Sequence, residues 1–214
     1  MRTRIKICGI TREEDARACA ELGADAIGLV FYPPSPRCLA PERARALREV
    51  LPPFVQTVAL FVNPAEGEVR RVIDTVRPDL LQFHGEESPA FCEGFGLPYL
   101  KAIRVRSDAV SPGGGGGALL EYARPFVGAA GWLFDSHVEE YGGVGAGFDW
   151  SLIPPALARP LVLSGGLSPR NVGEAVRRVR PWAVDVSSGV ESAKGIKDAA
   201  KIAAFITEVS NADQ

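Results

Sequence analysis

The sequence predicts an α/β fold in which eight parallel strands, each followed by a helix, close into a single (β/α)8 TIM barrel. Eight short runs rich in β-branched residues recur along the chain, with amphipathic segments between them. The runs are apolar enough to be buried on both faces, as the strands of parallel sheets are. The 214 residues allow about 27 residues per unit, which suits a barrel near the lower size limit of about 200 residues.

The expected elements alternate without interruption. The strands are predicted at residues 4–8, 26–31, 57–62, 80–83, 99–105, 131–135, 161–164 and 183–186. The helices are predicted at residues 12–22, 41–51, 65–76, from 88, 117–124, 150–153, 168–179 and 196–209. Thr11 is the expected N-cap of the first helix, and Pro41 suits the first turn of the second.

A doubly wound open sheet is the structural alternative to the barrel. Its glycine fingerprint, GxGxxG, is absent after the first strand, where the chain reads Cys8-Gly9-Ile10-Thr11. We therefore expect a closed barrel that forms one domain over residues 1–214.

Composition and charge exclude several classes of protein. An apolar content of 46% can fill a core, which excludes fibrous and disordered proteins despite 23 Gly and 17 Pro. A net charge of -2 without blocks of like charge disfavours nucleic-acid binding, and no apolar run approaches the about 18 residues of a membrane span. The four cysteines show no CxxC spacing, so we expect a cytoplasmic protein with free thiols and no metal site.

The loops after the seventh and eighth strands predict a phosphate site. They are rich in small residues, namely Gly165 and Gly166 in one loop and Ser187, Ser188 and Gly189 in the other. Glycine lets backbone N–H groups approach an anion, and a short helix expected after Gly189 would point its positive end there. Tight turns would explain one such loop, but two adjacent loops favour phosphate, which barrels often bind at this place.

Cys8 and Asp135 are candidates for base and acid. They end the first and sixth strands, so both side chains could reach one small ligand across the barrel mouth. A thiol and a carboxyl so placed suit proton abstraction and proton donation. On spacing alone, Cys8 is better explained as a small buried apolar residue, and a loop cap explains Asp135 equally well.

The period-two alternation of strands predicts a buried ion pair. Lys6 and Cys8 share one face of the first strand, as Asp185 and Ser187 do on the eighth, and a closed barrel makes these strands neighbours. We hypothesise that Lys6 pairs with Asp185 inside the barrel, because an unpaired buried charge costs too much. Such a lysine would favour the thiolate form of Cys8. Asp185, at the end of the eighth strand, is also a candidate for contact with a bound substrate.

Four stretches together resemble the phosphoribosylanthranilate isomerases of tryptophan biosynthesis. They are residues 6–11 (KICGIT), 81–85 (LQFHG), 133–136 with 141–150 (LFDS and YGGVGAGFDW), and 164–172 with 185–191 (SGGLSPRNV and DVSSGVE). The resemblance implies a barrel enzyme that converts N-(5-phosphoribosyl)anthranilate to 1-(2-carboxyphenylamino)-1-deoxyribulose 5-phosphate by an Amadori rearrangement. It implies neither a metal nor an organic cofactor.

The resemblance also implies residue roles. Asp135 matches the general acid, which protonates the ring oxygen, and Cys8 matches the general base, which takes the proton from C2′. Burial should then raise the pKa of Asp135, and a nearby cation should lower that of Cys8. Arg37 matches an arginine that holds the anthranilate carboxylate, although a solvated loop cation explains it without the resemblance. His84 lines the aromatic end of the pocket or is held by a loop carbonyl.

Two segments depart from the family pattern. Gly142 and Gly143 are expected to border the substrate, but Val144 follows them where the family usually has threonine, which removes a hydroxyl. Residues 111–117 contain five consecutive glycines and lack the Lys-Ser/Thr ending of a phosphate-binding P-loop. We expect this run to be a flexible linker or a lid.

The sequence is compatible with two other functions. Another phosphosugar enzyme, such as an epimerase or a lyase like the tryptophan synthase α subunit, would be expected to use carboxylates rather than a thiol on the first strand. A barrel that only binds a phosphosugar would need neither Cys8 nor Asp135. The expected partner is thus a phosphoribosyl substrate rather than nucleic acid or a membrane, and the protein could be a monomer or a homodimer.

Overall fold

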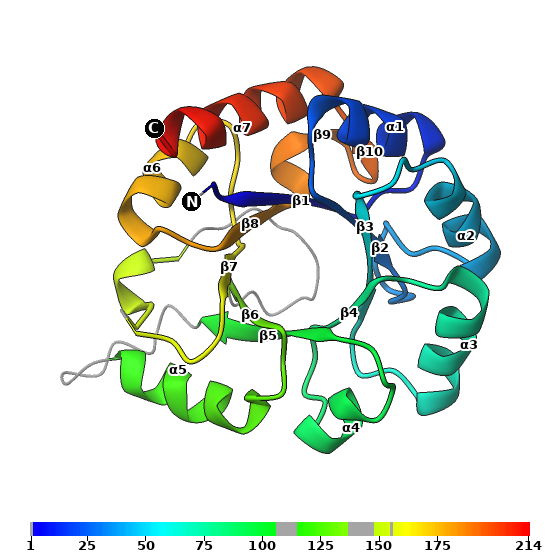
Figure 1. The fold of residues 1–214 in the computed structure, drawn as a ribbon, viewed down its shortest axis with the longest axis horizontal. Helices are drawn as coiled ribbons and strands as arrows, with labels where there is room; N and C mark the ends of the chain where they lie inside the picture. The colour runs from blue at the N-terminus through cyan, green and yellow to red at the C-terminus, as the bar shows by residue number, and fades with distance from the viewer. Residues whose placement is uncertain (1, 106–114, 137–147, 155) are drawn as a thin grey trace.

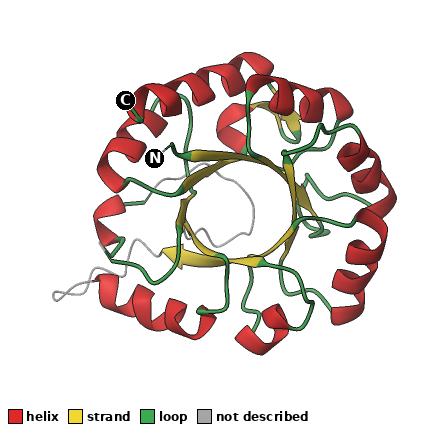
Figure 2. Ribbon diagram, viewed as in Figure 1, coloured by secondary structure: helices red, strands yellow, loops and turns green. Residues whose placement is uncertain are grey.

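The computed structural model describes residues 2–105, 115–136, 148–154 and 156–214. Eight parallel strands close a barrel in sequence order, and the helices surround it (Figures 1 and 2). The strands are β1 (Arg4–Cys8), β2 (Ala26–Val30), β3 (Gln56–Phe61), β4 (Leu80–Phe83), β5 (Tyr99–Val105), β6 (Gly131–Ser136), β7 (Leu161–Leu163) and β8 (Ala183–Val186). The predicted fold and all eight strands are confirmed.

Seven α-helices are assigned within the described residues. They are α1 (Glu13–Leu22), α2 (Pro41–Glu49), α3 (Glu66–Val76), α4 (Pro89–Glu93), α5 (Gly115–Ala123), α6 (Val172–Val179) and α7 (Ala199–Ala212). Single 3-10 turns form at η1 (Arg124–Phe126), η2 (Trp150–Leu152) and η3 (Ser188–Val190). In the part of the chain that the structure describes, none of these helices is long and apolar enough to cross a membrane.

Three predicted helix starts are wrong. Helix α6 begins at residue 172 rather than 168, because residues 169–171 form a turn in which Asn171 Oδ1 accepts a hydrogen bond from the Ser168 N–H. Arg12, not Thr11, is the N-cap of α1, because the Thr11 hydroxyl instead donates a hydrogen bond to the carbonyl oxygen of Gly195. The last helix begins at residue 199 rather than 196, because β9 (Glu191–Ala193) and β10 (Ile196–Lys197) form an antiparallel hairpin before it. Asp198 caps α7 by accepting hydrogen bonds from the backbone N–H groups of residues 200 and 201.

The glycine run is only partly a linker. Residues 115–117 form the first turn of α5, so the expectation of a loop through residue 117 is wrong there, while residues 111–114 lie outside the described part. Leu119 and Ala123 of the same helix are buried in the core. Their packing offsets the low helix propensity of the preceding glycines.

Strand alternation divides the apolar residues between two layers. Ile5 and Ile7 of β1 belong to the large core between the strands and the surrounding helices. Lys6 and Cys8, the alternate residues, are buried as well, and Cys8 packs with Val30 of β2. The barrel interior therefore carries the polar groups of β1, as the period-two pattern predicted.

A buried ion pair fixes the loop after β4. Lys101 of β5 donates from Nζ to Glu87 Oε2 at 2.7 Å, and the two side chains are 0% and 2% exposed. Lys101 also donates to the carbonyl oxygen of Gly85, and Glu87 accepts from the backbone N–H groups of Asn63 and Gly85. The loop between β4 and α4 is thus bound to β5 through Lys101 and to the segment that follows β3 through Asn63.

We predict that Lys101→Met lowers the free energy of unfolding in urea by about 3–5 kcal/mol, because it leaves the Glu87 carboxylate buried without its cation. Adding Glu87→Gln should recover part of that loss. As a control, Arg45→Met breaks an exposed pair with Glu49 and should cost less than about 1 kcal/mol. Equal losses in Lys101→Met and Arg45→Met would contradict this account of the buried pair.

Candidate active site

The ion pair predicted inside the barrel is present. Pairing of β1 with β8 places Lys6 opposite Asp185, and Lys6 Nζ lies 2.9 Å from Asp185 Oδ1. The two side chains are 6% and 5% exposed. Asp185, which was also a candidate for contact with substrate, therefore holds Lys6 in place.

Lys6 in turn faces the thiol of Cys8. A β-carbon added to Gly28 of β2 would lie 2.6 Å from Cys8 Sγ and 3.0 Å from Lys6 Nζ, so both atoms converge over this glycine. Burial raises the pKa of Cys8, the charge of Lys6 lowers it, and Asp185 raises it, with a net increase. The cation lowers the pKa of Cys8 as expected, but burial outweighs it and the net pKa lies above that of an ordinary cysteine. Without Lys6 the thiolate would be scarcer still.

Asp135 is joined to a histidine and a glutamine. His84 Nε2 lies 3.0 Å from Asp135 Oδ2, and Gln82 Nε2 lies 3.1 Å from His84 Nδ1. Because the amide nitrogen of Gln82 can only donate, His84 accepts at Nδ1 and donates from Nε2 to the carboxylate. Asp135 Oδ1 also accepts from the Ser136 N–H at 2.9 Å. His84 and Asp135 are 17% and 23% exposed, so both reach the barrel mouth.

Sequence reasoning found His84 but not this contact. The expected environments were the aromatic end of the pocket or a loop carbonyl, whereas the structure shows a hydrogen bond to Asp135. Gln82 was missed, although it lies two residues before His84 and therefore on the same face of the chain. That spacing is the signal that could have found it.

The two glycine-rich loops meet at the rim. Gly165 and Gly166 have φ values of 85° and 65°, and a side chain at Gly189 would overlap the carbonyl oxygen of Leu167. The loops after β7 and β8 are therefore in contact, as the predicted phosphate site requires. The short helix expected after Gly189 is wrong, because η3 contains Gly189 and the chain then enters β9.

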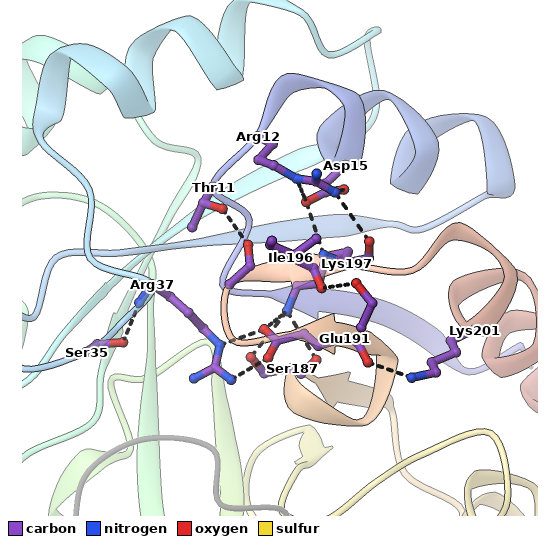
Figure 3. A network of polar contacts seen from close by, with 12 residues as sticks. Thr11, Arg12, Asp15, Ser35, Arg37, Ser187, Glu191, Ile196, Lys197 and Lys201 are labelled. Carbon is purple, nitrogen blue, oxygen red and sulfur yellow. Dashed lines mark hydrogen bonds and ion pairs between the residues drawn. The ribbon is translucent and has the colours of Figure 1, made fainter.

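Arg37 is buried rather than solvated. It follows β2, and its Nε and Nη2 each donate to Glu191 at 2.7 Å, with side chains 7% and 5% exposed. The interpretation of Arg37 as a solvated loop cation is therefore wrong. Glu191 and Lys197, which also contacts Glu191, were missed by sequence reasoning because no local spacing links them to Arg37 (Figure 3).

Gly142, Gly143 and the unusual Val144 all lie outside the described residues. Cys38, next to Arg37, is an exposed free cysteine.

The nearness of Cys8 to the Lys6–Asp185 ion pair predicts opposite effects of removing either charge. Lys6→Met should raise the pH at which Cys8 becomes half ionised, because it removes the cation that favours the thiolate. Asp185→Asn should lower that pH, because the carboxylate opposes ionisation. The rate of Cys8 alkylation by iodoacetamide against pH, followed by mass spectrometry in a Cys38→Ser background, measures both. Shifts in the same direction would contradict this arrangement.

Comparisons with known proteins agree with the fold and identify the family. A model of the N-(5'phosphoribosyl)anthranilate (PRA) isomerase family matches residues 5–208. The N-(5'-phosphoribosyl)anthranilate isomerase of Dechloromonas aromatica is 56% identical over 214 residues, which cover 100% of this chain and 99% of the relative.

Two crystal structures are also similar. The phosphoribosyl anthranilate isomerase of Thermotoga maritima has a TM-score of 0.86 at 43% identity, covering 98% of this chain and 99% of that one. A phosphoribosyl anthranilate isomerase in complex with reduced 1-(o-carboxyphenylamino)-1-deoxyribulose 5-phosphate has a TM-score of 0.82 at 41% identity, with the same coverage. The chain belongs to the N-(5'-phosphoribosyl)anthranilate isomerase family.

Proposed function

We propose that the chain acts in tryptophan biosynthesis as a single catalytic domain of residues 1–214. It converts N-(5-phosphoribosyl)anthranilate to 1-(2-carboxyphenylamino)-1-deoxyribulose 5-phosphate. One observation carries the proposal: Cys8 on β1 and Asp135 on β6 stand at the same rim, and the glycine-rich loops after β8 and β7 lie between them in barrel order. A phosphate held in those loops puts its sugar between a thiol and a carboxyl.

Asp135 acts first, as the general acid. Its carboxyl proton goes to the furanose ring oxygen while the C1′–O bond breaks, and the nitrogen lone pair forms the C1′ iminium. The carboxylate left behind keeps the hydrogen bond from His84 Nε2 and the one from the Ser136 N–H. These two donors stabilise the negative charge that appears on Asp135 as the ring opens.

Cys8 completes the reaction as the general base. Its thiolate takes the proton from C2′, and the C2′–H electron pair moves into the C1′–C2′ bond while the iminium electrons return to nitrogen. The resulting enolamine tautomerises to the ketose. Lys6 Nζ stabilises the thiolate, and Asp185 fixes the position of Lys6.

The two ends of the substrate bind at opposite sides of this pair. Backbone N–H groups of residues 165–166 and 187–189 hold the phosphate, and Asn171 braces the first of these loops by donating to the Gly166 carbonyl oxygen at 2.9 Å. Arg37 binds the anthranilate carboxylate.

The proposal places the enzyme in the cytoplasm, as a monomer or a homodimer. Gel filtration with light scattering separates the two states, since one chain has a mass of 22.8 kDa.

We predict that Cys8→Ser and Asp135→Asn each lower kcat by a factor of about 10²–10⁴ while KM changes little, because neither residue holds the phosphate or the carboxylate. The loss of substrate fluorescence measures the rate. Cys38→Ser, the same chemical change at an exposed cysteine, is the control and should keep wild-type activity. An inactive wild type, or unchanged rates in both variants, would refute the assignment.

His84 should matter through its hydrogen bond to Asp135. We predict that His84→Leu lowers kcat about tenfold or more, because the carboxylate loses a donor as its charge develops. His84→Gln keeps an N–H near the position of Nε2 and should retain a larger share of kcat. The two variants are compared at saturating substrate. If leucine and glutamine reduce kcat equally, the hydrogen bond is not what His84 contributes.

A further inference from the structure

Two basic side chains share one carboxylate at the rim of the barrel. Lys197 Nζ donates to Glu191 Oε1 at 2.8 Å, and the same carboxylate receives both hydrogen bonds from Arg37 (Figure 3). Arg37 follows β2, whereas Glu191 and Lys197 belong to the β9–β10 hairpin. All three residues are buried. We call them the arginine cluster.

The arginine cluster lies beside the residues of the proposed mechanism. A β-carbon added to Gly9, which directly follows Cys8, would lie 3.3 Å from Arg37 Cγ and 3.1 Å from Ser187 Oγ. Lys197 Nζ also donates to the Ser187 carbonyl oxygen at 3.1 Å. The hairpin thus connects Arg37 with the base on one side and with the expected phosphate loop on the other.

Glu191 occupies one edge of the Arg37 guanidinium. A guanidinium has five N–H donors in one plane, and Glu191 accepts from Nε and from Nη2. The opposite edge, formed by Nη1 and the second Nη2 hydrogen, points away from the hairpin in Figure 3. That edge can hold a second carboxylate through two parallel hydrogen bonds.

The charges of the arginine cluster do not balance. Two cations share one carboxylate, so one formal positive charge remains among three buried side chains. Burial raises the pKa of Glu191, but the hydrogen bonds and charges of Arg37 and Lys197 lower it below its ordinary value, so Glu191 stays ionised. An anionic ligand that balances the remaining charge gains more binding free energy at this buried site than it would at an exposed arginine.

We propose that Glu191 and Lys197 are positioning residues that select a substrate with a carboxylate on its aromatic ring. By accepting two hydrogen bonds from Arg37, Glu191 orients the guanidinium so that its other edge faces the ligand. The charge of Lys197 keeps the arginine cluster positive although Glu191 neutralises one cation. This inference rests on the proposed function, in which Arg37 binds the anthranilate carboxylate. It adds that Glu191 and Lys197 cause the preference for a substrate with a ring carboxylate.

The test compares two stable ligands: the reduced product, and the same molecule without the ring carboxylate. The ratio of their Kd values, measured by calorimetry, reports recognition of the carboxylate alone. The double variant Glu191→Gln/Lys197→Met keeps the net charge of the arginine cluster but removes the groups that orient Arg37. We expect the ratio to fall by at least about tenfold, towards that of Arg37→Met, while binding of the carboxylate-free ligand stays within about twofold.

A second variant separates orientation from charge. If the charge of the arginine cluster alone decided the affinity, Glu191→Gln would tighten binding of the ligand with the ring carboxylate, because a negative neighbour is lost. The proposal instead predicts weaker binding, because Arg37 loses the group that orients it. Should the double variant fail to fold in a melting experiment, Glu191→Asp keeps the charge, shifts Arg37 and should lower the same ratio. Glu49→Gln, which removes an arginine-bound carboxylate from the exposed face of α2, is the control.

The possible outcomes distinguish a failure of this inference from a failure of the proposed function. A wild-type ratio in the double variant and in Glu191→Asp, together with a lowered ratio in Arg37→Met, overturns the inference and leaves the proposed function intact. An unchanged ratio of Kd values in Arg37→Met would show that Arg37 does not bind the ring carboxylate, and it would overturn this inference as well. Failure of the wild type to bind the reduced product refutes the proposed function itself.

Discussion

The pairing of β1 with β8, which closes the barrel, is the constraint on which the rest of the site depends. It sets Lys6 opposite Asp185 in register and so makes possible a buried ion pair between residues at the two ends of the chain. The pair places a cation against the Cys8 thiol and so offsets part of the rise in pKa that burial causes there. Closure also brings the loop after β8 next to the end of β1. One backbone arrangement thus supplies the base, its cation and one wall of the anion site.

Buried lysines recur inside the barrel and near its rim, and each fixes a different part of the site. The pairs are Lys6 with Asp185, Lys101 with Glu87, and Lys197 with Glu191. The first holds the base, the second fixes the loop that carries His84, and the third holds the hairpin that orients Arg37. Salt bridges of this kind add little net stability, since desolvation offsets the attraction. Their value here is positional, because breaking one leaves a buried charge that forces the loop to move.

The sequence was sufficient for the parts of the structure that follow from local periodicity. Short runs of β-branched apolar residues predicted all eight strands. The period-two alternation of β1 and β8 predicted the Lys6 pair, because closure of the barrel makes these strands neighbours. The contacts that it missed join side chains far apart in the chain: Arg37 and Glu191 are separated by 154 positions, and nothing near either residue indicates the other. The sequence also identified the cation that lowers the pKa of Cys8, but not the depth of burial that outweighs it. The prediction of Thr11 as a helix cap was wrong for a similar reason, because its hydroxyl donates a hydrogen bond to the carbonyl oxygen of Gly195, far along the chain.

The central claim is that one phosphoribosyl ligand lies between Cys8 and Asp135. The most direct measurement is a crystal structure of this chain with the reduced product bound. The account predicts the phosphate in the loops of residues 165–166 and 187–189, with Cys8 Sγ within about 3.5 Å of C2′ and the ring carboxylate on the free edge of Arg37. A phosphate bound elsewhere, or a C2′ atom beyond the reach of Cys8, would contradict the account.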